Sequence, residues 1–173
     1  MRYTPTALLT TAGTALALLA GAGAANAAPA PAPAQATVQQ QIDGILAKNP
    51  DAVQTGKTTV TLEKGAVTLR MAGATGVDAC GAGLFCLWEH ADYGGQMVSW
   101  KGSPVLCKAN RTINLTDYGF SDRASSWANN SDYLADVWEH EDRGGRRLWT
   151  ELPGTYLREN PDGDEATSLN CYA

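Results

Sequence analysis

The sequence predicts an all-β fold, a sandwich of two Greek-key motifs that follows a short N-terminal helix and hairpin. Three observations lead to this prediction. An eight-residue motif occurs twice, with its copies fifty residues apart. Hydrophobic and polar residues alternate only over short runs that end at Gly, Asn, Asp or Pro, which is typical of short strands. All five Trp and all four Cys lie in residues 80–173, so we expect the core there.

The first residues have the features of an export signal. Residues 1–27 begin with Arg2, continue with an apolar stretch over residues 7–20 and end in the small-x-small sequence Ala25-Asn26-Ala27, typical of a secretory signal peptide. A transmembrane helix needs about 20 apolar residues, and this stretch is shorter and contains Gly. We therefore expect a secreted, extracellular protein. Residues 28–36 alternate Pro and Ala, which predicts an extended linker.

Residues 37–79 predict one helix and one hairpin. Hydrophobic residues recur at helical spacing after the potential cap Thr37, and Asn49-Pro50 ends the pattern. Two alternating runs then flank the turn Lys64-Gly65, which indicates a hairpin. Because so small a unit cannot stand alone, it either packs on the Trp-rich domain as an accessory segment or is a removable pro-segment.

The repeat defines the main domain, residues 80–173. The sequence WEHADYGG at Trp88 returns as WEHEDRGG at Trp138, identical at six of eight positions. Further along, residues 122–127 correspond to residues 164–169, so the offset falls from fifty to forty-two residues and the second copy is shorter by eight. Each copy contains enough short alternating runs for four strands, and two such copies suggest paired Greek keys.

The repeated motif resembles the βγ-crystallin family. An aromatic residue, four residues, a second aromatic residue, one residue and Gly form that family's folded hairpin, matched by Trp88, Tyr93 and Gly95. The second copy has Arg143 in place of the second aromatic. The resemblance implies that the later segments 121–126 and 163–168 bridge back to the hairpins. In the family these segments contribute to calcium sites, and the first acidic or amide position is replaced in both copies.

A narrower resemblance is to the secreted proteins grouped with the Streptomyces metalloproteinase inhibitor. It rests on the segment from Cys80 to Trp88, in which Cys80 and Cys86 enclose five residues, on the export signal and on the hairpin repeat. It covers about residues 80–173 and implies a non-enzymatic inhibitor of secreted metalloendopeptidases. Such an inhibitor presents an exposed, disulfide-braced loop as a pseudo-substrate.

The crystallin resemblance also implies the disulfide pairing. In crystallin-type pairs the third strand of each Greek key crosses to the partner sheet and lies beside the partner's fourth strand. Cys107 would lie near the third strand of the first copy, and Cys171 in the fourth strand of the second. We therefore predict the pairs Cys80–Cys86 and Cys107–Cys171.

Composition argues against several other functions. The formal net charge is −5, which gives no attraction to nucleic acids or anionic lipids, so we expect neither as a partner. We also expect the protein to be a monomer. His90 and His140 occupy equivalent repeat positions, which favours a structural role over a metal site. The chain has neither the second His of a zinc-protease helix nor a Gly-x-Ser-x-Gly elbow, so we expect no enzyme. Ser125, Ser126 and Ser168 are expected to bond hairpin corners.

No cofactor is required by these patterns, and calcium is the one candidate ligand. It binds several oxygen ligands, which the hairpin loops could supply. The alternative is that the same side chains only satisfy backbone groups. The candidate ligands are Glu89, Asp122, Ser125, Glu139, Asp164 and Thr167.

Two long equivalent connections, residues 99–110 and 149–160, are the candidates for an interaction loop. Residues 105–113 are favoured because Cys107 anchors them. The candidate contact residues are Val105, Leu106, Cys107, Lys108 and Arg111. An inhibitor of metalloendopeptidases is the preferred function. A calcium-binding structural protein and a crystallin-like antimicrobial toxin are the alternatives.

Overall fold

The computed structural model describes residues 36–73, 75–108 and 111–173. The predicted signal peptide and all of the predicted linker except Ala36 lie outside these ranges. Within the described residues, no helix is long and apolar enough to cross a membrane.

The N-terminal helix α1 spans Val38–Lys48, as predicted. It begins with a capping box, in which the Thr37 hydroxyl accepts from the Gln40 N–H and the Gln40 side chain accepts from the Thr37 N–H. It ends where the Asn49 N–H donates to the Ile45 carbonyl at 3.0 Å. Ile42 and Ile45 are buried, so the apolar stripe of the helix faces the core.

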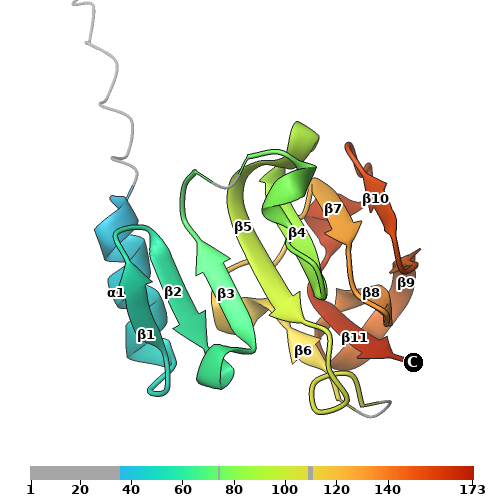
Figure 1. Cartoon of the computed structure of the whole chain (residues 1–173), viewed down its shortest axis with the longest axis horizontal. Coiled ribbons are helices and arrows are strands. Elements are labelled where there is room, and N and C mark those ends of the chain that lie inside the picture. The colour runs from blue at the N-terminus through green and yellow to red at the C-terminus, as the bar shows by residue number, and fades with distance from the viewer. Residues whose placement is uncertain (1–35, 74, 109–110) are drawn as a thin grey trace, which may run out of the picture. The chain divides into compact units, whose positions relative to one another are not determined.

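Three strands follow the helix: β1 (Val53–Gly56), β2 (Thr59–Leu62) and β3 (Val67–Arg70). Strands β2 and β3 form the predicted hairpin, with Val60 opposite Leu69. Strand β1 was not predicted, because all four of its residues are exposed and the run lacks an apolar alternation. Strand β3 pairs with β5 of the first Greek key, so the hairpin extends that sheet (Figure 1).

The main domain contains four strands per repeat, as expected. The first copy holds β4 (Leu84–His90), β5 (Gly94–Lys101), β6 (Ile113–Asn114) and β7 (Ser126–Asn129). The second holds β8 (Leu134–His140), β9 (Gly144–Glu151), β10 (Thr155–Leu157) and β11 (Ser168–Tyr172).

The third strand of each copy crosses to the other copy's sheet. Strand β6 pairs with β11, and β10 pairs with β7. The two antiparallel sheets have the orders β1-β2-β3-β5-β4-β7-β10 and β6-β11-β8-β9. This exchange of third strands confirms the predicted βγ-crystallin-like sandwich.

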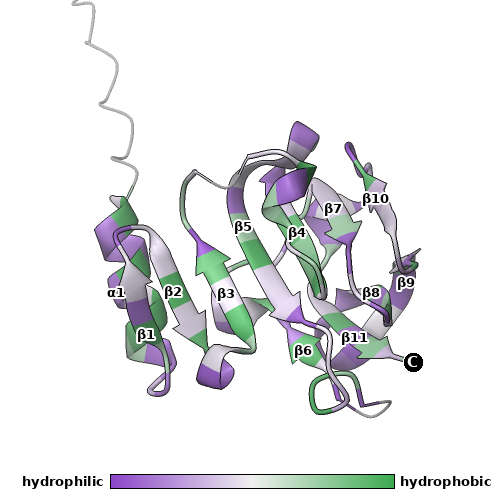
Figure 2. Ribbon diagram, viewed as in Figure 1, coloured by the Kyte–Doolittle hydropathy of each residue, from purple (hydrophilic) through white to green (hydrophobic). Residues whose placement is uncertain are grey.

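The main core lies between the two sheets. Phe85 and Trp100 are stacked with ring centroids 5.5 Å apart, and both belong to the same buried cluster as Val137 of the second copy and Ile42 of the helix. The N-terminal segment therefore shares one core with the Greek keys. In Figure 2 the hydrophobic residues form bands along the central strands. A smaller cluster around Trp88 covers the outer face of the larger sheet.

Candidate functional site

Both predicted disulfides are present. Cys80 pairs with Cys86, with Cα atoms 5.9 Å apart, and Cys107 pairs with Cys171, with Cα atoms 4.4 Å apart. Cys171 lies in β11, whereas Cys107 lies in the connection that precedes β6. The second disulfide therefore ties the connection between β5 and β6 to the second Greek key.

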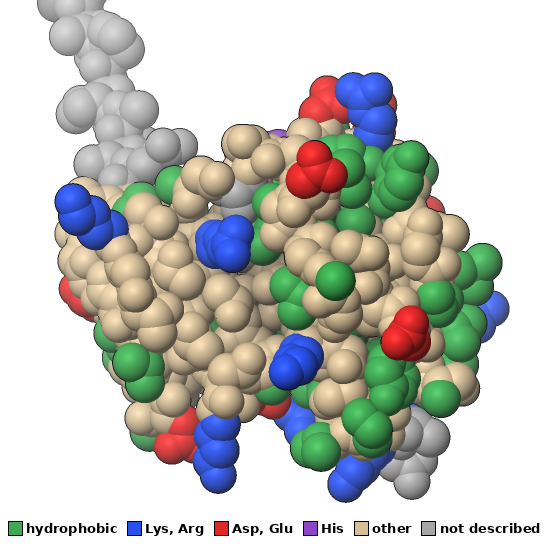
Figure 3. Space-filling model, viewed as in Figure 1, with side chains coloured by type: hydrophobic (Ala, Val, Ile, Leu, Met, Phe, Trp, Pro, Cys, Tyr) green, Lys and Arg blue, Asp and Glu red, His purple; other side chains and the backbone are tan. Residues whose placement is uncertain are grey.

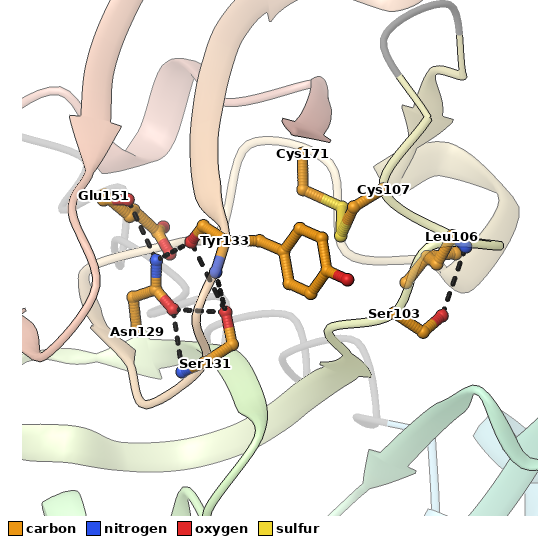
Figure 4. Close-up of a disulfide and its surroundings, with 8 residues drawn as sticks. All are labelled: Ser103, Leu106, Cys107, Asn129, Ser131, Tyr133, Glu151 and Cys171. Atoms are coloured by element: carbon orange, nitrogen blue, oxygen red, sulfur yellow. Dashed lines mark hydrogen bonds between the residues drawn. A yellow bond between two sulfur atoms is a disulfide. The ribbon is translucent and has the colours of Figure 1, made fainter. Parts of the chain in front are cut away.

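The segment around Cys107 is a compact turn with an exposed tip. The Ser103 hydroxyl accepts from the Leu106 N–H at 3.2 Å, and the Ser103 carbonyl accepts from the Cys107 N–H at 2.7 Å (Figure 4). Leu106 and Cys107 are buried, while Val105 is 69% exposed. Lys108 is also exposed. Of the predicted contact residues, Leu106 and Cys107 are thus anchors, and Val105 and Lys108 are available to a partner.

A buried polar network lies beside the start of this connection, where β7 of the first Greek key leads into the second. The Asn129 side chain donates to the backbone carbonyls of Tyr133 and Glu151 and accepts from the Ser131 hydroxyl at 2.7 Å. In Figure 4 the Tyr133 ring lies beside the Cys107–Cys171 bond. The chain at Gly102 passes close to these residues, since a Cβ there would lie 2.8 Å from the Ser131 Cβ. The network therefore packs directly against the start of the connection.

Glu151 is the least expected member of this region. Its side chain is fully buried, and one carboxylate oxygen accepts from the Trp149 indole N–H at 3.1 Å. Among the described residues, its other oxygen has no hydrogen-bond partner. Burial raises the pKa of Glu151 to about 8, against a smaller opposing effect of the Trp149 hydrogen bond. The carboxyl group is therefore mainly protonated at neutral pH.

The far end of the connection is held by the N-terminal hairpin. Arg111 forms an ion pair with Glu63, whose other oxygen accepts from the Tyr118 hydroxyl at 2.5 Å. Sequence reasoning missed Glu63, because no motif connects it to residues so distant in the chain. Only the pairing of β3 with β5 brings them together.

The repeated serines bond the hairpin corners, as predicted. The Ser125 hydroxyl donates to the Glu89 carbonyl at 2.7 Å, and the Ser126 hydroxyl donates to the His90 carbonyl at 2.7 Å. In the second copy, the Ser168 hydroxyl donates to the His140 carbonyl at 2.6 Å. In both hairpins a serine hydroxyl is therefore bonded to the backbone carbonyl of the histidine and holds the corner.

The candidate calcium ligands fall into separate sets. Arg123 donates to the Glu89 carboxylate at 2.6 Å. Burial would raise the pKa of Glu89, but Arg123 and the Gln96 N–H together lower it below the usual value. In the second copy, the Glu139 carboxylate accepts from the Arg146 N–H at 3.1 Å.

The remaining candidate calcium ligands lie in the segments that bridge back to the hairpins. The Thr167 hydroxyl bonds to Asp122 at 3.2 Å, and Asp164 is exposed. Among the described residues, no three His, Cys, Asp or Glu side chains gather to hold a metal. Arginines already lie beside the two hairpin carboxylates, so a bound calcium ion would have to compete with them.

Comparisons with solved structures find βγ-crystallin domains. A structure from a study of the evolution of the eye-lens βγ-crystallin fold is 12% identical, with a TM-score of 0.46, and the match covers 62% of this chain and 97% of that one. A βγ-crystallin domain from Clostridium beijerinckii is 24% identical, with a TM-score of 0.40, over 51% of this chain and 95% of that one. A βγ-crystallin from Ciona intestinalis is 22% identical, with a TM-score of 0.40, over 51% and 98%.

The family is indicated by the sequence itself. No curated protein matches the chain. Residues 73–151, which begin ahead of β4 and end with β9, match the model of peptidase inhibitor family I36. This part of the chain is therefore similar to peptidase inhibitor family I36.

Proposed function

We propose that the protein is a secreted inhibitor of metalloendopeptidases and that it presents the connection containing residues 105–113 to the enzyme. The observation that carries this proposal is the bracing of that connection. The Cys107–Cys171 disulfide, the turn at Ser103 and the Arg111–Glu63 ion pair hold it at three points. These contacts hold the described residues of the connection on either side of residues 109–110, and residues that are held in place before binding lose little entropy on binding, which is what an inhibitor needs.

The exposed side chains of the connection suit a contact surface. Val105 offers an apolar group at 69% exposure, and the exposed Lys108 lies on the other side of the buried Cys107. An apolar side chain on a rigid turn can enter a peptidase subsite with little loss of conformational freedom. On the face shown in Figure 3, charged side chains are scattered and do not form a single strongly charged patch.

The cysteine chemistry supports an extracellular location. All four Cys form disulfides, which persist in oxidising compartments. Together with the expected signal peptide, this supports secretion. An extracellular inhibitor would meet secreted endopeptidases directly.

The test is titration of a thermolysin-type metalloendopeptidase with the purified protein. We expect stoichiometric loss of peptidase activity and weaker inhibition by Val105→Asp and Lys108→Glu. Val53→Asp is the matched control, because Val53 is a comparably exposed valine, 58%, on β1 at the edge of the sheet. No inhibition at micromolar excess would reject this target class. If Val53→Asp weakened inhibition equally, residues 105–113 would not be the inhibitory loop.

A further inference from the structure

Glu63 connects the N-terminal hairpin to the proposed inhibitory connection. One of its carboxylate oxygens pairs with the Arg111 guanidinium, and the other accepts from the Tyr118 hydroxyl. Both side chains of the ion pair are only about one-third exposed, at 36% for Arg111 and 30% for Glu63. Burial, followed by the hydrogen bond to Glu63, raises the pKa of Tyr118, so its hydroxyl remains a donor.

The position of Glu63 is fixed by the fold. It stands in the tight turn between β2 and β3, where Glu63, Lys64 and Gly65 all have positive φ. On either side of the turn, Leu62 is 2% exposed and Val67 is fully buried. Backbone strain and buried neighbours together leave the Glu63 side chain little freedom to move away from the domain.

The same turn also holds the other end of the connection. The Ala66 carbonyl, three residues after Glu63, accepts from the Lys101 N–H at 2.8 Å, at the point where β5 ends. Glu63 pairs with Arg111, two residues before β6 begins. The turn of the N-terminal hairpin therefore bonds to both the start and the end of the connection, while the Cys107–Cys171 disulfide holds its middle.

Arg111 is also bonded to the exposed part of the connection. Its backbone N–H donates to the Lys108 carbonyl at 2.9 Å. Holding the Arg111 side chain therefore restricts where Lys108 can lie. The Cys107 N–H is bonded to the Ser103 carbonyl and does not depend on this contact.

We infer that Glu63 is a positioning residue for the inhibitory connection and that the N-terminal helix and hairpin are part of the working inhibitor. This inference rests on the function proposed above. It assigns an inhibitory role to a segment that lies outside the residues matched by the family model. An inhibitor without this segment would keep its disulfide but lose the contacts at both ends of the connection.

The first test is amide hydrogen exchange in the full chain, which does not depend on any peptidase. In Glu63→Gln and in Arg111→Gln, we expect the backbone amide of residue 111, corrected for the intrinsic rate of its side-chain type, to exchange about threefold to tenfold faster than in the wild type, because a charge-assisted contact is lost. The double variant should exchange no faster than either single one. The Cys107 amide is the internal control and should exchange at the wild-type rate.

Two further variants separate positioning of the connection from general docking of the hairpin. Tyr118→Phe removes the other Glu63 contact and leaves the ion pair, and Glu159→Gln neutralises an exposed carboxylate elsewhere. Both should leave Arg111 exchange unchanged. An unchanged Arg111 amide in Glu63→Gln, or an equal acceleration in Tyr118→Phe, would overturn the inference. If Glu63→Gln fails to fold, Arg111→Gln alone decides the same question.

The second test measures inhibition of the metalloendopeptidase. Glu63→Gln should raise the inhibition constant by a similar threefold to tenfold factor, roughly, while Glu159→Gln leaves it unchanged. The charge-reversed pair Glu63→Arg with Arg111→Glu should recover part of the loss. A wild-type protein that does not inhibit would reject the proposed function, and the exchange data would then decide the role of Glu63. A wild type that inhibits no better than Glu63→Gln would overturn that role.

Discussion

The two Greek keys differ most in the connection between their second and third strands. In the first copy, residues 102–112 link β5 to β6, whereas in the second only residues 152–154 link β9 to β10. This difference accounts for the whole drop in repeat offset from fifty to forty-two residues. The short connection shows that the fold needs only a tight turn here. The longer one is an addition, and its bracing by a disulfide and an ion pair fits the inhibitory role proposed for it.

The hairpin corners differ in a second way. In the first copy, Trp88 is fully buried and meets Tyr93 edge to face at 5.3 Å. In the second copy, Arg143 replaces the tyrosine, and the half-buried Trp138 donates its indole N–H to Asn170 at 2.8 Å. The first corner is therefore an apolar cluster, and the second is a more polar surface corner.

The largest expected effect comes from truncating these equivalent tryptophans. Trp88→Ala leaves a cavity under the first corner and should lower the free energy of unfolding by about 3 to 5 kcal/mol. Trp138→Ala removes a half-buried side chain and should cost roughly half as much. Urea unfolding of both variants measures the difference. Equal losses would show that the two corners are packed equally well.

The two disulfides give the next effect. Replacing Cys107 and Cys171 together by Ser opens a loop with a sequence separation of 64 and should cost about 4 kcal/mol. The same change at Cys80 and Cys86, with a separation of 6, should cost about 2 kcal/mol. We expect only the first pair to weaken inhibition strongly, because it anchors the connection. Unfolding and inhibition assays on both variants provide the comparison.

The internal repeat was enough to predict most of the fold. What could not be predicted are contacts between individual side chains. Apart from the exposed strand β1, the strands and the helix follow from alternation and capping, and both disulfides follow from the resemblance to the two families. The bond between Glu63 and Arg111 could not be predicted, because it depends on β3 pairing with β5 across two elements of unrelated sequence. The burial of Leu106 next to the exposed Val105 could not be predicted either. A short irregular turn has no periodicity that would indicate which side chain points inward.

Glu151 provides a third contrast, since the equivalent residue fifty positions earlier is the exposed Lys101. The pKa of Glu151 is about 8 in the folded protein against 4.5 for an unperturbed carboxyl group. Between these pH values the folded state holds a proton that the unfolded state has lost, so stability falls as pH rises and levels off above pH 8. This behaviour follows from burial without a charged partner among the groups that influence its pKa.

Glu151→Gln should remove this pH dependence and stabilise the protein by up to about 3 kcal/mol at pH 7. Urea unfolding between pH 5 and pH 9 would measure this pH dependence. The wild type should lose stability over this range, and the variant should lose less. Glu159→Gln, at an exposed site, should keep the wild-type slope. Parallel curves for Glu151→Gln and the wild type would show that another group titrates.

The smallest expected effect is that of calcium on the melting temperature. It tests a feature that both hairpins have, a carboxylate that lies beside an arginine. Glu89 is paired with Arg123, and the Glu139 carboxylate lies near Arg146, which also contacts Glu165 at 2.5 Å. These arginines supply the positive charge that a cation would otherwise bring, so millimolar calcium should change the melting temperature by less than about 1 °C. Arg123→Ala should cost at most about 1 kcal/mol, because the ion pair is partly exposed. A clear rise in melting temperature with calcium, reversed by a chelator, would show that the carboxylates can exchange arginine for metal.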